Sequence, residues 1–253
     1  MNRKARALAL RPEIEAKVPD TAFVLAAGLG KRMRPLTATR PKPLVEVAGK
    51  PLIDHVLDRL SAAGIEKIVV NVHYLADVLE AHLKARAKDF DVKISDERKQ
   101  LMETGGGLTS AQPLIDADPF LVINSDNYWI DGPADTLHLL ASLWREEDMD
   151  ALLLLVPQAR AGNHGGQGDF HMKSDGRLVR REKGKVAPFV FTGIQIVSKR
   201  LLRDAPPGPF STNILWDRAI ADGRCFGAVH QGLWFDVGNP AAISHALRRV
   251  RSP

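Results

Sequence analysis

Short apolar runs alternate with helical patterns along the first half of the chain. Apolar runs predict buried strands at 21–26, 67–72, 91–95 and 120–126. Between them, apolar residues at helical spacing predict helices at 51–63, 75–86, 106–115 and 133–145. This alternation is typical of βαβ units built around a mostly parallel sheet. We therefore predict an α/β fold.

The second half of the chain contains more strand patterns than helix patterns. We predict strands at 151–156, 189–197, 224–229 and 233–237. The turn sequence Ser174-Asp175-Gly176 predicts a β-hairpin between 168–173 and 178–181. A short helix is expected at 217–221, and Asn239 followed by Pro240 predicts the start of a terminal helix.

Composition and charge limit the kinds of partner. The chain has 253 residues of which 45% are hydrophobic, enough for one large domain, which we place at 21–253 after a basic N-terminal arm at 1–20. No apolar run could span a membrane, and the single Cys225 cannot form an internal disulfide, so we expect a cytoplasmic protein with a buried thiol. The charge of +5 and only 6% aromatic residues favour a small anionic substrate over nucleic acid.

The most informative motif follows the first predicted strand: Ala26-Ala27-Gly28-Leu29-Gly30-Lys31-Arg32-Met33-Arg34. Glycines let backbone N–H groups approach a ligand, and the neighbouring cations add full positive charges. A P-loop is excluded because Arg32, and not Ser or Thr, follows Lys31. A dinucleotide-binding motif is excluded because its third glycine is missing. The motif predicts a polyphosphate site. In an open α/β sheet that site lies at the carboxyl ends of strands, together with residues 124–126 and Asp236.

With Pro41-Lys42-Pro43-Leu44 and Gly49-Lys50-Pro51-Leu52, this motif resembles the N-terminus of sugar-1-phosphate nucleotidyltransferases. Within that family the chain is most similar to the short bacterial N-acetylmuramate-1-phosphate uridylyltransferases. The later blocks that support this are Glu103-Thr104-Gly105-Gly106-Gly107, Gly168-Asp169-Phe170, Phe191-Thr192-Gly193-Ile194 and Trp234-Phe235-Asp236-Val237-Gly238. The resemblance implies a three-layer αβα, Rossmann-like mixed, mostly parallel sheet with a small β-hairpin subregion for the acceptor sugar.

The resemblance also implies a reaction. A phosphate oxygen of the sugar 1-phosphate attacks the α-phosphorus of a nucleoside triphosphate, with UTP favoured, and pyrophosphate leaves. Arg34, helped by Lys31 and Arg32, would hold the β- and γ-phosphates, and Lys42 would reach the α-phosphate. Asp126 and Asp236 would bind Mg²⁺. The product would serve cell-wall sugar recycling.

The remaining implied contacts divide between the two substrates. The nucleotide would also lie against Ala26, Ala27, Gly28, Gly30, Met33, Glu103, Thr104, Gly105 and Gly106. The acceptor sugar would face Asn163, Asp169, Thr192 and Gly193, with His164 and the pair Glu182-Lys183 as further candidates. Ser125 stands where the family usually has glycine.

Several alternatives stay open at this point. The sequence is also compatible with a mannose-1-phosphate guanylyltransferase or a glucose-1-phosphate thymidylyl- or uridylyltransferase. The choice of nucleotide base depends on a few hydrogen bonds whose geometry the sequence does not show. A non-catalytic nucleotide-sensing homologue is disfavoured, because the chain keeps Arg34, Lys42, Asp126 and Asp236. Both a monomer and a homodimer are compatible with the sequence.

Overall fold

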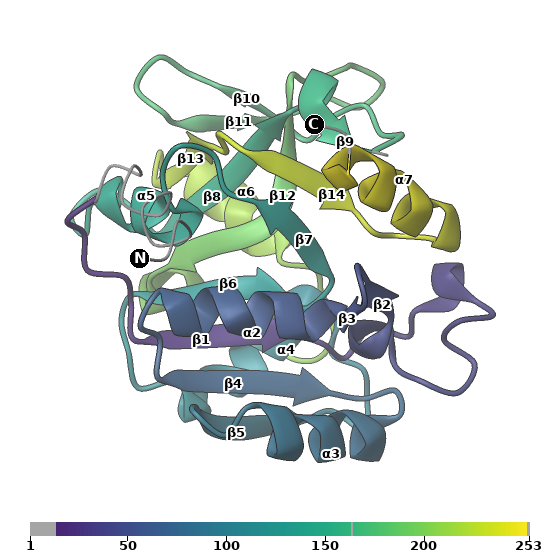
Figure 1. The fold of residues 1–253 in the computed structure, drawn as a ribbon. Coiled ribbons are helices and arrows are strands. Elements are labelled where there is room, and N and C mark those ends of the chain that lie inside the picture. The colour runs from purple at the N-terminus through teal and green to yellow at the C-terminus, as the bar shows by residue number, and fades with distance from the viewer. Residues whose placement is uncertain (1–13, 163, 252–253) are drawn as a thin grey trace, which may run out of the picture.

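A nine-stranded mixed sheet forms the centre of the computed structural model, which describes residues 14–162 and 164–251 (Figure 1). One part of the sheet has parallel strands in the spatial order β6-β1-β4-β5. Their bounds are Phe120–Asn124, Thr21–Leu25, Lys67–Val72 and Asp91–Asp96. All four strands lie within two residues of the predicted bounds. Three of them, β1, β4 and β6, are apolar runs buried in the sheet, whereas β5 is a partly exposed edge strand.

The sheet becomes antiparallel beyond β6. There β12 (Phe189–Val197) runs antiparallel to β6 and also to β8 (Ala151–Pro157), and β13 (Cys225–Val229) lies parallel to β8. The predicted hairpin is present at the edge as β10 (Phe170–Met172) and β11 (Leu178–Arg180). The predicted α/β class with a mixed sheet is confirmed.

Helices cover both faces of the sheet, as Figure 1 shows. In β1, Ala22 and Val24 belong to the apolar cluster on one face, and Phe23 belongs to the cluster on the other. The first face is covered by α2 (Leu52–Ala62), α3 (Ala76–Arg86) and α5 (Thr136–Ser142). The second face is covered by α4 (Glu103–Ala111) and α6 (Asn213–Ala221). The three-layer arrangement follows from this two-sided burial.

A second, three-stranded sheet lies beside the first, in the order β7-β14-β9. Its strands are β7 (Asn127–Ile130), β14 (Leu233–Asp236) and β9 (Ala161–Gly162). The sequence did not predict β7. Tyr128 and Phe235 of this sheet pack with Met33 in a third apolar cluster, together with residues of α7 (Pro240–Arg251). The remaining short elements are β2 (Glu46–Val47), β3 (Lys50–Pro51) and the 3₁₀ turns η1 (Lys31–Met33), η2 (Lys42–Leu44), η3 (Gln112–Leu114), η4 (Gln158–Arg160) and η5 (Lys199–Leu202).

Three helices differ from the predicted bounds, and one of them, α6, begins at Asn213 and not at residue 217. The helix α4 begins at Glu103 and not at residue 106, because its glycines pack closely against a neighbouring segment and do not interrupt the helix. The helix α5 begins only at Thr136, because the Asp135 carboxylate caps it by accepting hydrogen bonds from two backbone N–H groups, those of Leu137 and His138. Asn239 caps α7 as predicted, accepting from the Ala242 N–H at 3.0 Å.

The N-terminal arm lies mostly outside the described residues, since 1–13 are not among them. Of the part that is described, Val18 is 8% exposed and belongs to the larger apolar cluster. Among the described helices, none combines the length and the apolar character that a membrane crossing requires. Cys225 is buried at 1% exposure, as predicted, and burial raises the pKa of its thiol to about 12.

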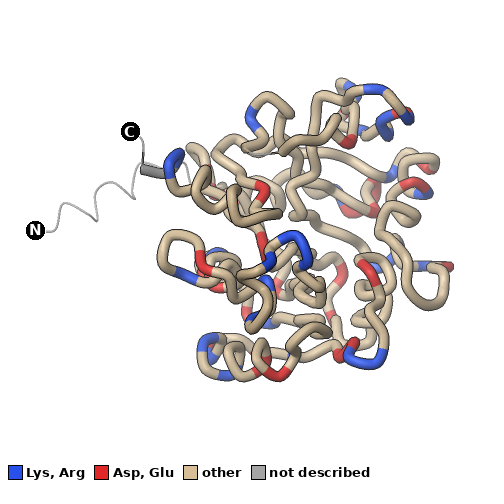
Figure 2. Tube along the Cα trace, turned by 90° about the vertical axis from the view of Figure 1, so that its right-hand side faces the viewer, with Lys and Arg blue, Asp and Glu red and all other residues tan. Residues whose placement is uncertain are grey.

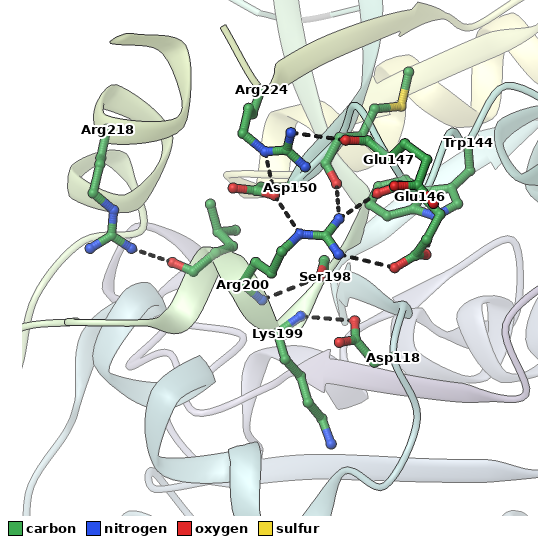
Figure 3. A network of polar contacts seen from close by, with 12 residues as sticks. Asp118, Trp144, Glu146, Glu147, Asp150, Ser198, Lys199, Arg200, Arg218 and Arg224 are labelled. Carbon is green, nitrogen blue, oxygen red and sulfur yellow. Dashed lines mark hydrogen bonds and ion pairs between the residues drawn. The ribbon is translucent and has the colours of Figure 1, made fainter. Parts of the chain in front are cut away.

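A polar network joins the starts of β8 and β13 to the end of β12 (Figure 3). The carboxylate of Asp150 accepts hydrogen bonds from Nε of Arg200 and Nε of Arg224, each at 2.9 Å. Arg200 also donates to the Glu146 carboxylate at 3.1 Å, and Arg224 to the Glu147 carbonyl at 2.9 Å. One carboxylate thus fixes the ends of three strands in the antiparallel part of the sheet.

Candidate active site

The glycine loop after β1 is closed by side chains that follow it. Gly30 has a left-handed backbone (φ +60°), and the Thr37 hydroxyl donates to its carbonyl at 2.9 Å. A Cβ on Gly30 would lie 3.0 Å from Thr37 Cγ2 and 3.1 Å from Lys42 Cβ. Both the φ angle and this close packing favour glycine. Gly28, by contrast, has open space where a Cβ would stand, and it lines the first hollow described below.

The cations of this loop point in different directions. Met33 is completely buried in the third apolar cluster, so the short turn η1 is anchored there and the three cations around it are exposed. Arg32 lines a hollow, and its Nη1 would be 3.3 Å from a Cβ on Gly238. Lys31 and Arg34 line neither of the two hollows described below.

The first hollow, of about 230 Å³, lies at the carboxyl ends of β1 and β6. Its walls come from the glycine loop, the start of η2, the end of β4 and the start of α4. The residues that line it are Leu25, Ala26, Ala27, Gly28, Lys42, Pro43, Asn71, Leu101, Glu103, Thr104, Asn124, Ser125 and Asp126. Seven of these residues were predicted to bind the nucleotide or to act in catalysis, and they lie at the strand ends, where such a sheet usually binds its ligand.

Gly105 and Gly106, which were also predicted to contact the nucleotide, line neither hollow, and the same holds for Gly30, Lys31 and Met33. A Cβ on Gly105 would lie 2.4 Å from the Phe210 ring, and one on Gly106 would lie 2.5 Å from the Gly208 carbonyl oxygen. The glycines therefore permit α4 to pack against the segment before α6. Their N–H groups both donate to the Phe210 carbonyl, at 2.8 and 3.1 Å.

The second hollow, of about 190 Å³, adjoins the first and shares Asn124 and Asp126 with it. It contains Asp236 as well. The two aspartates are far apart in sequence, but Asp236 of β14 pairs with Asn127 of β7, the residue next to Asp126. The lining is completed by Arg32, Asn127, His164, Asp169, Val190, Phe191, Thr192, Gly193, Trp234, Phe235 and Val237.

Lys42 is paired with Asp126 where the two hollows meet. The ammonium group of Lys42 contacts the carboxylate of Asp126, and the Lys42 side chain is only 14% exposed. On the other side of the hollow, Nδ1 of His164 lies 3.6 Å from Oδ2 of Asp236. Each aspartate therefore has a basic neighbour. Figure 2 shows that Lys and Arg elsewhere are distributed over separate loops, with Asp and Glu between them.

Three residues predicted to face the acceptor sugar, Asp169, Thr192 and Gly193, line the second hollow, and the side chains of the first two form hydrogen bonds within the protein. The Asp169 carboxylate accepts from the Phe191 N–H at 2.9 Å, and the Thr192 hydroxyl donates to the Leu154 carbonyl at 2.8 Å. Gly193 has a φ of +83°, and a Cβ there would lie 2.5 Å from Nδ2 of Asn124. Asn163 lies outside the described residues, and Glu182 and Lys183 are exposed and line neither hollow.

Two asparagines that sequence reasoning did not select, Asn71 and Asn127, lie in the hollows together with Asn124, which was expected there. Asn71 interrupts the apolar run near the end of β4, Asn124 ends β6, and Asn127 begins β7. That interruption was the available signal. Asn127 joins both parts of the second hollow, because its amide donates to the Gly193 carbonyl at 3.1 Å and accepts from the Trp234 indole N–H at 2.9 Å.

The donor set fits a magnesium ion that is shared with a substrate. Mg²⁺ in phosphate-transfer sites is typically held by one or two carboxylates together with substrate phosphates and water. Asp126 and Asp236 supply two carboxylates to one hollow, with side chains 32% and 35% exposed. Among the described residues no group of three or more His, Cys, Asp or Glu side chains could enclose a metal. The site thus fits a substrate-assisted ion, and not a closed structural one.

Comparison with known proteins gives consistent matches over nearly the whole chain. The family model described as nucleotidyl transferase matches residues 21–252. The N-acetylmuramate alpha-1-phosphate uridylyltransferase of Caulobacter vibrioides is 47% identical, covering 93% of this chain and 98% of the relative. The enzyme of the same name from Neisseria meningitidis serogroup B is 37% identical, covering 89% and 96%. The inositol-1-phosphate CTP transferase of T. maritima has the same fold, with a TM-score of 0.75 at 18% identity over 93% of this chain and 96% of that one.

Proposed function

The chain belongs to the nucleotidyl transferase family, and from that premise we propose that it transfers a uridylyl group from UTP to N-acetylmuramate 1-phosphate. An oxygen of the sugar phosphate would form a new bond to the α-phosphorus of UTP. The bond from that phosphorus to the bridging oxygen of the β-phosphate would break, and pyrophosphate would leave. The products are UDP-N-acetylmuramate and pyrophosphate, formed in cytoplasmic cell-wall sugar recycling.

The observation that carries this proposal is the junction of the two hollows at Asn124 and Asp126. A nucleotide in the first hollow and a sugar phosphate in the second would bring their phosphates together at that junction. Lys42 reaches the junction from one side and Arg32 lines the second hollow. The geometry therefore supports catalysis by positioning two anions and neutralising their charge.

No protein base is required for this reaction, because the attacking phosphate oxygen is already anionic. Lys42 would stabilise the negative charge that builds up around the α-phosphate, and the N–H groups near Gly28 would orient the triphosphate. A magnesium ion bound by Asp126 and Asp236 would neutralise charge on the phosphates. Arg32 would contribute a further positive charge beside Asp236.

The ion pair between Lys42 and Asp126 gives this site a defined resting arrangement. Neither charge is exposed alone, since each compensates the other. When a triphosphate enters, Lys42 can turn from the carboxylate to a phosphate oxygen, and Asp126 can turn to the cation that accompanies the nucleotide. Each of the two side chains then keeps a partner of opposite charge.

A substrate panel tests the proposal directly. Purified protein with Mg²⁺ is given each of UTP, GTP, dTTP, CTP and ATP with N-acetylmuramate, glucose and mannose 1-phosphates, and pyrophosphate release is measured. We expect the highest kcat/KM with UTP and N-acetylmuramate 1-phosphate. A strong preference for GTP, or for mannose 1-phosphate, would overturn the proposal in favour of a guanylyltransferase.

Two variants test the assigned roles. We expect Lys42→Ala and Asp236→Ala each to lower kcat by a factor on the order of 10² or more, as for the loss of one group that stabilises developing charge. Lys50→Ala is the matched control, because its ammonium group pairs with the exposed carboxylate of Asp58 and lines neither hollow. Near-normal turnover of Lys42→Ala or Asp236→Ala would contradict the role of that residue.

A further inference from the structure

A buried carboxylate, Glu97, lies behind the first hollow and outside its lining. Glu97 is 3% exposed and follows directly after β5. Its Oε1 accepts from Nδ2 of Asn71 at 2.7 Å, and its Oε2 accepts from the Met102 N–H at 3.0 Å. A buried carboxylate needs such partners, since leaving it without them costs several kcal/mol or forces its protonation.

Asn71 continues this chain of hydrogen bonds to the glycine loop. Its Oδ1 accepts from the Ala26 N–H at 2.6 Å, and Asn71 itself is 2% exposed. The Ala26 N–H therefore connects through Asn71 and Glu97 to the Met102 N–H. Ala26 lies in one wall of the first hollow, and Met102 lies between Leu101 and Glu103, which line the hollow at the start of α4.

The helix α4 closes over this pair without leaving space. A Cβ on Gly107 would lie 2.7 Å from Oε1 of Glu97 and 3.0 Å from Nδ2 of Asn71. Glycine at position 107 therefore lets α4 approach Glu97 and Asn71 closely. Gly105 and Gly106 in the same way let α4 approach the segment before α6. Burial raises the pKa of Glu97, and the hydrogen bonds from Met102 and Asn71 oppose that shift.

We propose that Glu97 and Asn71 are positioning residues that hold the two walls of the first hollow at the separation the nucleotide requires. The inference rests on the proposed function, because it takes the first hollow to be the nucleotide site. Neither residue needs to contact the reacting phosphates. Their effect is on nucleotide affinity, through Ala26 on one wall and Met102 on the other.

The donors and acceptors of this pair make a swap experiment possible. In Glu97→Gln an amide NH₂ replaces one oxygen and faces a donor, from either Asn71 or Met102. In Asn71→Asp a carboxylate oxygen replaces the donor and faces Glu97. In the double variant the new amide of residue 97 donates to the new carboxylate of residue 71. That carboxylate still accepts from Ala26, and the remaining oxygen of residue 97 still accepts from Met102.

The readout is equilibrium binding of UTP with Mg²⁺ by titration calorimetry, together with separate KM values for UTP and for N-acetylmuramate 1-phosphate. We expect each single variant to weaken UTP binding on the order of tenfold, the size of one buried hydrogen bond lost. The KM for the sugar phosphate should change much less. The double variant should recover to within about threefold of the parent protein, since all hydrogen bonds are restored.

Asp54→Asn is the matched control. Asp54 is also a buried carboxylate, at 6% exposure, with Nε2 of His82 at 2.7 Å from its Oδ1, but it lies on α2 and lines neither hollow. It should lower the stability to urea and leave UTP affinity unchanged. The inference is overturned if Glu97→Gln folds and binds UTP as the parent protein does, or if the double variant fails to recover. Absence of nucleotide binding by the parent protein overturns the proposed function instead.

Discussion

Removal of the Asp150 carboxylate should destabilise the antiparallel part of the sheet. In Asp150→Ala the Nε groups of Arg200 and Arg224 both lose an acceptor at 2.9 Å. The Asp150 side chain is 14% exposed, so water replaces the carboxylate only partly. Two guanidinium groups would then be neighbours without the negative charge that separates them.

The size of the effect follows from what each arginine keeps. A hydrogen bond to a charged group contributes about 1.5–3 kcal/mol. Arg200 retains the Glu146 carboxylate and two backbone carbonyls, Arg224 retains the Glu147 carbonyl, and both side chains are about 30% exposed. The two losses are therefore not fully additive, and we expect a decrease in the free energy of unfolding of about 2–3 kcal/mol. For a chain of this length that corresponds to a fall in Tm of roughly 4–12 °C.

Urea denaturation at pH 7.5, followed by fluorescence and far-UV circular dichroism, measures the change. Asp148→Ala is the control from the same segment, because its pair with Nε of Arg145 at 2.8 Å is half exposed. Exposed pairs of this kind contribute about 0–1 kcal/mol. The reasoning is refuted if Asp150→Ala costs no more than Asp148→Ala.

Three further predictions concern the loop cations, pH and the thiol. Arg32→Ala should lower kcat/KM at least tenfold more than Arg34→Ala, because Arg32 alone of the two lines a hollow; equal losses in the kinetic assay would contradict this. Burial lowers the pKa of His230 below its usual 6.5. The unfolded chain therefore binds the extra proton first, and the stability to urea should fall as pH decreases below about 6.5, less so in His230→Gln. Cys225 should react with a thiol reagent at pH 8 only in urea, and rapid labelling of the native protein would argue against its burial.

The sequence predicted the inner strands β1, β4, β6 and β8 well, because burial on both faces makes each one a largely apolar run. It missed β7, since Ser125 and Asp126 are the only residues between β6 and β7, and so short a break looks like the end of a single strand. That omission matters for the site. The pairing of β7 with β14 is what places Asp236 near Asp126, and no spacing in the sequence contains that information.

The directions in which the side chains of the glycine loop point could also not be predicted from the sequence. Lys31, Arg32 and Arg34 are equivalent cations in a linear motif. Only the turn that buries Met33 decides which of them faces the hollow. The glycines of α4 illustrate the same point. The sequence does not distinguish a glycine that leaves room for a ligand from one that leaves room for a neighbouring segment of the protein. The placement of Asn71 and Glu97 depends likewise on contacts between separate elements.

The two hollows draw on successive stretches of the chain. Every residue that lines the first hollow lies between Leu25 and Asp126, whereas most of the second hollow comes from residues 164–237. During synthesis on the ribosome, all residues that line the first hollow have been made when half of the chain is complete, and Asp236 follows more than a hundred residues later. Substitutions in the later stretch can therefore reshape the second hollow while the residues of the first stay unchanged. The two hollows can thus diverge separately within one gene.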